Sequence, residues 1–252
     1  MRVFRGRADQ PAADRAVADR LLSAAAEGIP SVRVWAPPRQ VAFGRRDTRE
    51  ETYGAAARAA RNAGFVPLER DVGGRAVAYT GDTLAFAAAM PTDIAAADDG
   101  IEGRYNRTTE TVVSVLDGLG SSVSVGEPAA SFCPGDHSIR VEDGGKLSGI
   151  AQRVTADAVV VAGCLIVTPA DAAAIRSVLS PVYGALSVPF DPASVGSVAD
   201  GGGPADTERV ARALEASLVR LLVDEPVRND GRPAAGDADV RREIVRVGSE
   251  PR

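Results

Sequence analysis

The stretch GGKLSGIAQR, residues 144–153, is the most specific part of the sequence. Asp143 precedes its two glycines, and an Asp-Gly-Gly turn is a strong hairpin signal because glycine adopts positive φ angles freely. The flanking residues are apolar or alternate with polar ones, as they do in strands that bury one face. We therefore predict three successive strands, over 138–142, 147–154 and 158–167.

The rest of the chain interleaves helices and strands. Apolar residues at helical spacing, bounded by capping residues and glycines, predict helices, whereas short apolar runs between turn residues predict strands. This mixture, with its short hairpins, favours an α+β fold over a strict βαβ alternation. The predicted helices are 12–27, 47–62, 101–119, 169–178 and 206–222, and the predicted strands are 31–36, its hairpin partner 40–44, 66–70, 76–79 and 83–90.

The chain has 252 residues, of which 45% are hydrophobic and 25% charged, so it can bury a core without disulfides or metals. Residues 1–223 are predicted to form one domain. Residues 224–252 are rich in Asp, Arg, Pro and Gly with little periodicity, which predicts a polar, mobile tail. The sequence has no apolar run long enough to span a bilayer and no visible secretory signal, so we expect a cytoplasmic protein without a membrane partner. We also expect a monomer.

Charge and cysteine content exclude several classes of function. The net charge is −5, with few aromatic residues and no basic run, which argues against nucleic acid as a partner. Cys133 and Cys164 do not make a disulfide framework and are expected to be reduced thiols. Cys164 lies inside an apolar strand and is predicted to be inert core. One histidine and two cysteines are too few for a zinc site, so we expect no metal.

Lysine is nearly absent from the chain. The 29 basic residues comprise 28 arginines and one lysine, Lys146. A coding bias against lysine explains the scarcity, and chance survival is one explanation of Lys146. The other explanation is a tight site that needs a compact ammonium, which arginine cannot replace.

The segment SFCPGDH, residues 131–137, contains groups that can carry chemistry. A thiol followed by Pro-Gly is held in a turn, where Cys133 can be exposed, and the imidazole of His137 can take its proton. Lys146, across the predicted hairpin, could polarise an acyl carbonyl or hold an oxyanion. Asp136 and His137 are therefore candidate supporting residues. The alternatives are a structural cysteine and a surface histidine.

A second glycine-rich turn, from Arg70 to Ala76, lies between two predicted strands. Its paired glycines, Gly73 and Gly74, allow positive φ angles and close approach of the backbone to a ligand, with Arg70 and Arg75 at the mouth. The alternative is a plain tight turn with surface arginines. The patterns GxxxxGK[ST] and GxGxxG are absent, so the turn alone does not indicate a nucleotide site.

Five motifs follow one another along the chain, between about Val3 and Leu222: RVW ending at Trp35, GRR at 44–46, RxxGGRAV at 70–77, NRT at 106–108 and GGKLSGIAQR at 144–153. This order resembles the lipoate–protein ligase A and octanoyltransferase superfamily, which shares the catalytic fold of biotin–protein ligases. The resemblance implies a mixed, largely antiparallel sheet flanked by helices, related to the class II synthetases. It also implies that Lys146 contacts the activated acyl group and that the paired-glycine turn lines an acyl and nucleotide pocket. The pocket residues expected on this basis are Trp35, Arg70, Gly73, Gly74, Arg75, Ala76, Gly149 and Ala151. Packing in the core is the alternative role of Trp35.

The segment around Cys133 looks most like the cysteine-dependent octanoyl amidotransferases. Those enzymes move octanoate from the glycine-cleavage H protein to lipoyl domains of 2-oxoacid dehydrogenase E2 subunits through a thioester. The resemblance therefore implies that Cys133 is the nucleophile, that octanoate or lipoate is transferred, and that no cofactor is needed. Two departures count against a self-sufficient ATP-using ligase. Arg75 and Tyr79 stand where such ligases usually carry a third glycine and a histidine, and no accessory domain follows Leu222.

Two alternatives stay open. The first is a lipoate–protein ligase that uses ATP and Mg²⁺ to make an acyl-adenylate, with Lys146 on the α-phosphate and carbonyl and Cys133 incidental. The second is a regulator without catalytic activity that binds lipoate or biotin. The co-occurrence of Cys133, His137 and Lys146 argues against the regulator.

Overall fold

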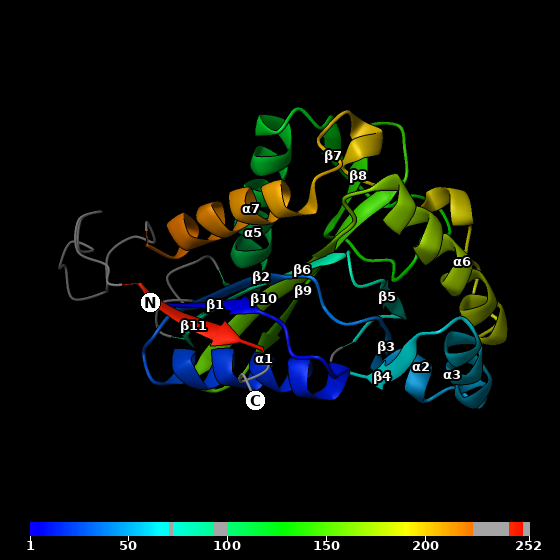
Figure 1. Ribbon diagram of the computed structural model, residues 1–252, viewed down its shortest axis with the longest axis horizontal. Coiled ribbons are helices and arrows are strands. Elements are labelled where there is room, and N and C mark those ends of the chain that lie inside the picture. The colour runs from blue at the N-terminus through cyan, green and yellow to red at the C-terminus, as the bar shows by residue number, and fades with distance from the viewer. Residues whose placement is uncertain (71–72, 93–99, 224–241, 249–252) are drawn as a thin grey trace.

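A computed structural model describes residues 1–70, 73–92, 100–223 and 242–248. Its strands are β1 (Arg2–Gly6), β2 (Ser31–Trp35), β3 (Gln40–Phe43), β4 (Val66–Glu69), β5 (Val77–Tyr79), β6 (Leu84–Pro91), β7 (Val123–Val125), β8 (Ser138–Val141), β9 (Lys146–Val154), β10 (Ala158–Leu165) and β11 (Glu243–Val247). Eight of them form one sheet in the order β11-β1-β2-β6-β10-β9-β8-β7, and β4-β3-β5 form a small second sheet (Figure 1).

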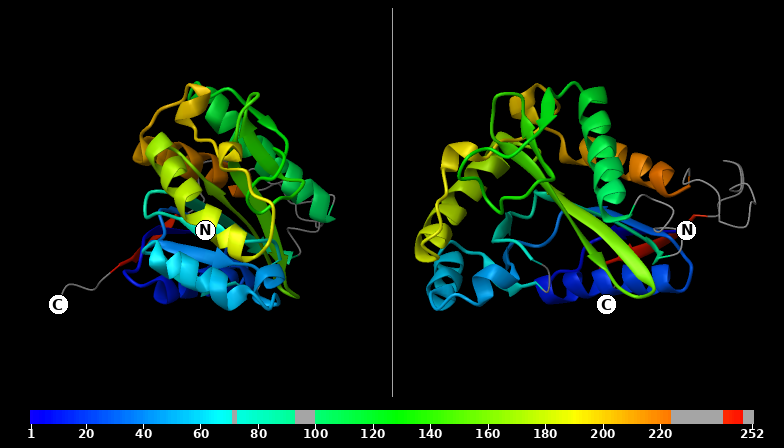
Figure 2. Two further views of the ribbon diagram at one scale, coloured as in Figure 1. Left: turned by 90° about the vertical axis from the view of Figure 1, so that its right-hand side faces the viewer. Right: turned by 180° about the vertical axis from the view of Figure 1, so that it is seen from behind.

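The large sheet is built around β6, whose eight residues are all buried. This strand, LAFAAAMP, pairs antiparallel with β2 on one side and β10 on the other. Only β1 makes parallel pairs among the described strands of this sheet, with β2 and β11. The predicted mixed, largely antiparallel sheet is therefore confirmed, as is the hairpin turn between β8 and β9. Figure 2 shows the long β9–β10 hairpin from behind.

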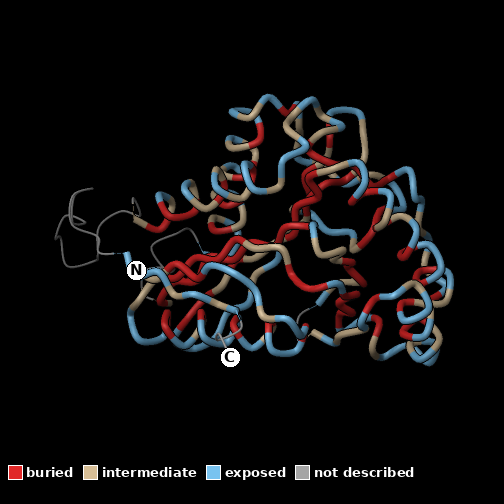
Figure 3. The backbone as a smooth tube through the Cα atoms, viewed as in Figure 1, coloured by how far each residue is buried: buried red, intermediate tan, exposed pale blue. Residues whose placement is uncertain are grey.

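Helices cover both faces of the large sheet. The helices of the chain that the structure describes are α1 (Pro11–Ala26), α2 (Arg45–Thr48), α3 (Tyr53–Asn62), α5 (Gly100–Gly118), α6 (Pro169–Ala185) and α7 (Thr207–Val223), and α2 and α3 lie against the small sheet. Helix α1 packs on one face against alanines of β6, while α5 and α7 pack on the other. Helix α7 buries Val210, Leu214 and Leu218 because residues three or four apart share one side of a helix. Figure 3 shows in red the buried residues of the large sheet and of the helix faces that pack on it.

The small sheet has its own core, which it shares with α3 and α6. Strand β3 was predicted to be the hairpin partner of β2, and that prediction is wrong. It pairs instead with β4, in parallel, and with β5, antiparallel. Pro37 and Pro38 lie between β2 and β3, and proline has no N–H with which to continue a ladder, so the chain leaves the large sheet there.

Other predicted boundaries also change. The helix predicted over 47–62 is divided into α2 and α3, and the helix predicted over 169–178 continues to Ala185 through Pro181. Strands β1 and β7 were not predicted. Part of the predicted tail is also a strand, since Glu243–Val247 pairs with β1 along its whole length. Residues 224–241 and 249–252 lie outside the described residues, so their predicted mobility stays a prediction.

No helix among the described residues is long and apolar enough to cross a membrane. The cytoplasmic location and the monomeric state stay predictions.

Candidate active site

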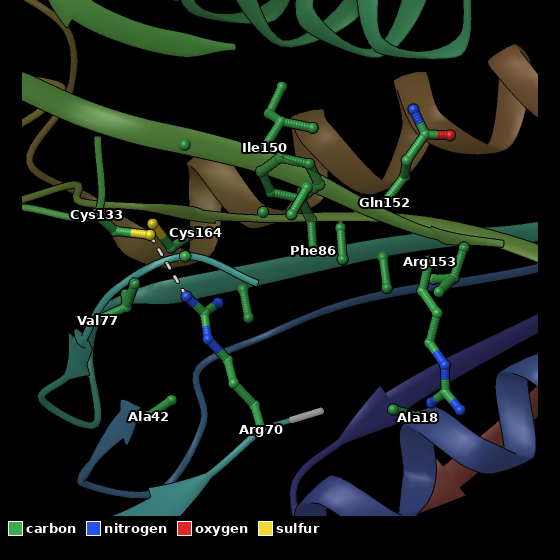
Figure 4. Close-up of a pocket in the computed structure, with 18 of the residues that line it drawn as sticks. Ala18, Ala42, Arg70, Val77, Phe86, Cys133, Ile150, Gln152, Arg153 and Cys164 are labelled. Atoms are coloured by element: carbon green, nitrogen blue, oxygen red, sulfur yellow. Dashed lines mark hydrogen bonds between the residues drawn. The ribbon is translucent and has the colours of Figure 1, made fainter. Parts of the chain in front are cut away.

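A cavity of about 560 Å³ lies where the inner face of the large sheet meets the small sheet and α1 (Figure 4). Alternate residues of β10, namely Cys164, Ala162 and Val160, line it, because alternate side chains of a strand point to one face. Ala85 and Ala87 of β6 line it beside them. Its walls are therefore mostly small and apolar over a length of about 13 Å along the strand, at about 3.3 Å per residue.

Cys133 stands at one end of this cavity in a strained backbone conformation. Its φ angle is 41°, a left-handed value that is uncommon outside glycine. The backbone N–H of Cys133 donates to the Tyr183 hydroxyl at 2.7 Å, and this hydroxyl donates to the carbonyl of Ala76 at 3.0 Å. These bonds hold the turn in place and leave the thiol half-buried at the cavity wall.

Two donors from the paired-glycine turn face the Cys133 sulfur. The backbone N–H of Arg75 lies 3.3 Å from Sγ, and Nη2 of Arg70 lies 3.4 Å from it. Arg70 is in turn fixed by a hydrogen bond to the Arg75 carbonyl at 2.8 Å. Burial by itself lowers the pKa of the Arg70 guanidinium, but Cys133 and Tyr79 beside it raise it overall. The sulfur therefore faces a permanent positive charge and a backbone donor.

Gly74 allows the glycine turn to lie this close to the Cys133 sulfur. Its φ angle is +89°, and a Cβ there would lie 2.8 Å from the Cys133 sulfur and 3.1 Å from Arg70 Nη2. Gly44 is needed for a similar reason, because a Cβ there would lie 2.2 Å from the Gly74 carbonyl oxygen. Glycines at these two positions thus let the backbone of the turn pack directly against the Cys133 thiol.

Lys146 begins β9 and is almost fully buried, with 1% of its side chain exposed. Its Nζ donates to the carbonyl of Cys133 at 2.9 Å and to that of Phe132 at 3.0 Å. It also forms an ion pair with Glu127 at 3.1 Å. An ammonium has three N–H bonds, and these acceptors use all of them. Gly149 leaves room for this side chain, since a Cβ there would lie 3.3 Å from Lys146 Cε.

Glu127 was missed by sequence reasoning. It lies in the loop after β7, next to Gly126 and Pro128, where no motif or periodicity marks it. Its carboxylate accepts hydrogen bonds from the hydroxyls of Ser131 and Ser138 in addition to the ion pair with Lys146. The proximity in sequence of a glutamate to the one lysine is too weak a signal to have found it.

Neither of the two candidate supporting residues makes a hydrogen bond to the Cys133 thiol among the described contacts. His137 lines the cavity, but its ring stacks on Tyr105, with centroids 3.8 Å apart and planes 6° apart. Asp136 is exposed and is not among the residues that line the cavity. Cys164 was predicted to be inert core. It is buried, and burial raises the pKa of its thiol, but it also lines the cavity near Cys133.

The predicted pocket residues fall into two groups. Trp35, Arg70, Gly73, Gly74, Gly149 and Ala151 line the cavity. Arg75 and Ala76 do not, since the Arg75 side chain turns away to Asp47 at 3.1 Å and Ala76 is buried in the core of the small sheet. The structure thus brings most of the set together, while Arg75 contributes its backbone alone.

The end of the cavity near α1 is polar. Asp14 and Arg33 form a buried ion pair at 2.5 Å, and the Trp35 indole donates to the same carboxylate at 2.8 Å. Burial lowers the pKa of the Arg33 guanidinium, and Asp14 partly offsets this. This ion pair closes the apolar part of the cavity, although the buried Nε of Arg33 has no hydrogen-bond partner among the described residues.

Within the described ranges, no group of three or more His, Cys, Asp or Glu side chains could hold a metal ion.

Comparison with curated proteins finds octanoyl-[GcvH]:protein N-octanoyltransferases. The one from Exiguobacterium sp. is 28% identical over 137 residues, which is 54% of this chain and 47% of the relative. The one from Geobacillus kaustophilus is 29% identical over 142 residues, 55% of this chain and 48% of the relative. The chain thus matches about half the length of these relatives.

Comparison with solved structures finds the same fold. A lipoate–protein ligase A bound with ATP has a TM-score of 0.70 at 17% identity, over 99% of this chain and 88% of that one. A lipoate protein ligase described as putative, from T. acidophilum with bound lipoic acid, has a TM-score of 0.67 at 16% identity, over 99% and 89% of the two chains. The family model for the lipoyl protein ligase A/B catalytic domain matches residues 10–219. Because that match covers most of the chain, this protein belongs to the lipoyl protein ligase A/B catalytic domain family.

Proposed function

We propose that this protein transfers an octanoyl or lipoyl group to a lysine of a lipoyl-domain protein through a thioester on Cys133. The single observation that carries the proposal is the placement of the Cys133 thiol. It stands at the end of an apolar cavity, 3.4 Å from the Arg70 guanidinium and 3.3 Å from the Arg75 N–H. A thiol so placed can reach the carbonyl of an acyl chain in the cavity, and a thioester divides a slow amide exchange into two faster steps.

In the first step, the Cys133 sulfur forms a bond to the carbonyl carbon of an acyl-lysine on the donor protein. The carbonyl electrons move to oxygen, and the carbonyl re-forms as the bond to the lysine nitrogen breaks. The amine leaves with the proton that the thiol gave up, so one thiol and one amide become one thioester and one amine. An acceptor lysine then attacks the thioester and regenerates the thiol.

Arg70 is a described group beside the Cys133 sulfur whose positive charge can stabilise the charge on the acyl oxygen. Both hydrogens of its Nη2 are used, by Arg75 and Cys133, but its buried Nε has no hydrogen-bond partner among the described residues. A guanidinium presents its donors in a fixed fork, which suits an oxyanion. A preorganised donor of this kind is typically worth 10²–10³-fold in rate.

Octanoyl-H protein of the glycine cleavage system is the donor we propose, and E2 lipoyl domains are the acceptors. The names of the curated relatives give octanoyl-[GcvH] as donor and a protein as acceptor, which supports the choice of donor. The apolar walls formed by Ala85, Ala87 and Ala162 suit a saturated chain of about eight carbons.

The test is intact-mass analysis after mixing the protein with an octanoylated carrier, with and without ATP. We expect one octanoyl adduct that forms without ATP, is removed by hydroxylamine, and is lost in Cys133→Ser. Octanoyl or lipoyl transfer that requires ATP and persists in Cys133→Ser would refute the thioester route and favour the ligase alternative.

A further inference from the structure

The carboxylate of Glu127 ties together both ends of the segment that carries the nucleophile. It accepts hydrogen bonds from the Ser131 hydroxyl before Cys133 and from the Ser138 hydroxyl after it. It also accepts the backbone N–H of Gly135 at 3.1 Å. One side chain therefore closes the loop 131–138 across its base.

Glu127 is also the counter-charge of Lys146. The ammonium is 1% exposed, and Glu127 Oε2 lies 3.1 Å from it. A buried ammonium that loses its partner is costly, because the charge stays out of water without compensation. Among the described residues, Glu127 is the only carboxylate within ion-pair distance of Lys146.

The ion pair fixes the direction of the ammonium. With one N–H directed to Glu127, the other two reach the carbonyls of Phe132 and Cys133, at 3.0 and 2.9 Å. Every N–H of Lys146 is thus used within the protein, and two of the three hold the backbone of the nucleophile itself. In this arrangement the ammonium has no free donor for an acyl oxygen.

We propose that Glu127 is a positioning residue that acts both through Lys146 and through its own hydrogen bonds to the loop 131–138, and that these contacts together fix the backbone of Cys133 so that its sulfur meets the acyl carbonyl. This inference rests on the proposed function, since it assumes acyl transfer to Cys133. It gives Lys146 a different task from the contact with the acyl group that the family resemblance implies. Positioning errors of about 1 Å cost about 100-fold in rate, so a role of this kind is measurable.

The experiment is a double-mutant cycle on thioester formation, with Glu127→Gln, Lys146→Met and the double variant. Single-turnover acylation of Cys133 is followed by intact mass over a range of octanoyl-carrier concentrations. We expect Glu127→Gln to lower the maximal rate by about 10–100-fold with the half-saturating concentration nearly unchanged. Because Glu127 acts in part through Lys146, the rate loss of the double variant should be smaller than the product of the two single losses.

Glu142→Gln is the matched control. Glu142 is an exposed glutamate at the end of β8, and its side chain makes no hydrogen bond or ion pair among the described residues, so the variant should acylate at the wild-type rate. Should Glu127→Gln unfold, Glu127→Asp keeps the charge on a shorter side chain. Its melting temperature should recover, while its acylation rate stays low because Lys146 is displaced.

Three outcomes would overturn the inference. They are a wild-type maximal rate in Glu127→Gln, rate losses that multiply in the double variant, and an acylation rate in Glu127→Asp that recovers together with its melting temperature. A wild-type protein that forms no thioester at all would instead refute the proposed function, before any variant is compared.

Discussion

Replacing Gly74 by alanine tests the geometry at the thiol most directly. The added Cβ would lie 2.8 Å from the Cys133 sulfur, closer than real Cβ contacts, and 3.1 Å from Arg70 Nη2. The sulfur must move by several tenths of an ångström or the glycine turn must open. We expect the rate of thioester formation to fall by about 10–100-fold, because misplacement of about 1 Å costs about 100-fold.

The same substitution has a separate cost in stability. At Gly74 the φ angle is +89°, and an L-residue forced into the left-handed region loses about 1–2 kcal/mol. For a chain of 150–250 residues this lowers the melting temperature by about 2–8 °C. A protein with so small a loss stays folded at 25 °C, so the loss of rate can be measured on native protein.

The neighbouring glycine supplies the control. At Gly73 the φ angle is outside the left-handed region, and a Cβ there would meet no described atom within 4 Å. Gly73→Ala should therefore retain the melting temperature and, although Gly73 lines the cavity, lose far less of the acylation rate than Gly74→Ala. The assays are thermal unfolding by circular dichroism and intact-mass kinetics. Equal losses in the two variants, or a wild-type rate in Gly74→Ala, would refute the reasoning.

Two further predictions concern the cavity and a buried carboxyl. Ala162→Phe fills the middle of the cavity, so the transfer of an octanoyl group should fall at least about 10-fold. The transfer of an acetyl group from the same carrier should be retained, because the shorter acyl group does not reach that part of the cavity. Equal losses for the octanoyl and acetyl groups would contradict the assignment of this cavity to the acyl chain. Burial raises the pKa of the Asp171 carboxyl above its ordinary value of 3.8, against the smaller effect of hydrogen bonds from Thr80 and Thr83. The folded state therefore binds the Asp171 proton more tightly than the unfolded state does. The protonated carboxyl stabilises the fold at acid pH, and this contribution is lost as pH rises through the raised pKa of Asp171. Asp171→Asn mimics the neutral carboxyl, so its melting temperature should rise relative to that of the wild type between pH 4 and pH 7 in paired thermal scans. A difference in melting temperature that stays constant over this pH range would refute the prediction.

Local sequence patterns predict much of this fold because turn residues and the spacing of apolar residues determine which short segments form helices and strands. The Asp143-Gly144-Gly145 turn and the apolar runs on both sides specify β8, β9 and β10 without reference to the rest of the chain. Strand pairing over longer distances is not encoded in this way. The pairing of β3 with β5 depends on where the chain goes after Pro38, and that of β1 with β11 depends on a partner about 240 residues away.

In the candidate site too, some residues could be predicted from local sequence, whereas others depend on the fold. Cys133, Lys146 and Gly74 could be found because their residue types are rare or conformationally special in their contexts. Glu127 could not, because one glutamate in a loop resembles many others until the fold places it against a buried ammonium. The spacing also allowed a Cys133–His137 contact, but the described residues show no hydrogen bond between them, and the His137 ring stacks on Tyr105.

The buried state of Lys146 has a consequence for a protein that would carry a reactive thioester. Side-chain amines are the natural acceptors of such acyl groups, and most enzymes display many of them to solvent. Here the remaining 28 basic side chains are guanidinium groups, which stay protonated and do not attack carbonyls at neutral pH. Lys146, the one amine side chain, is 1% exposed and tied to three acceptors. The sequence thus offers no exposed side-chain amine that would compete with an external lysine for an acyl group on Cys133.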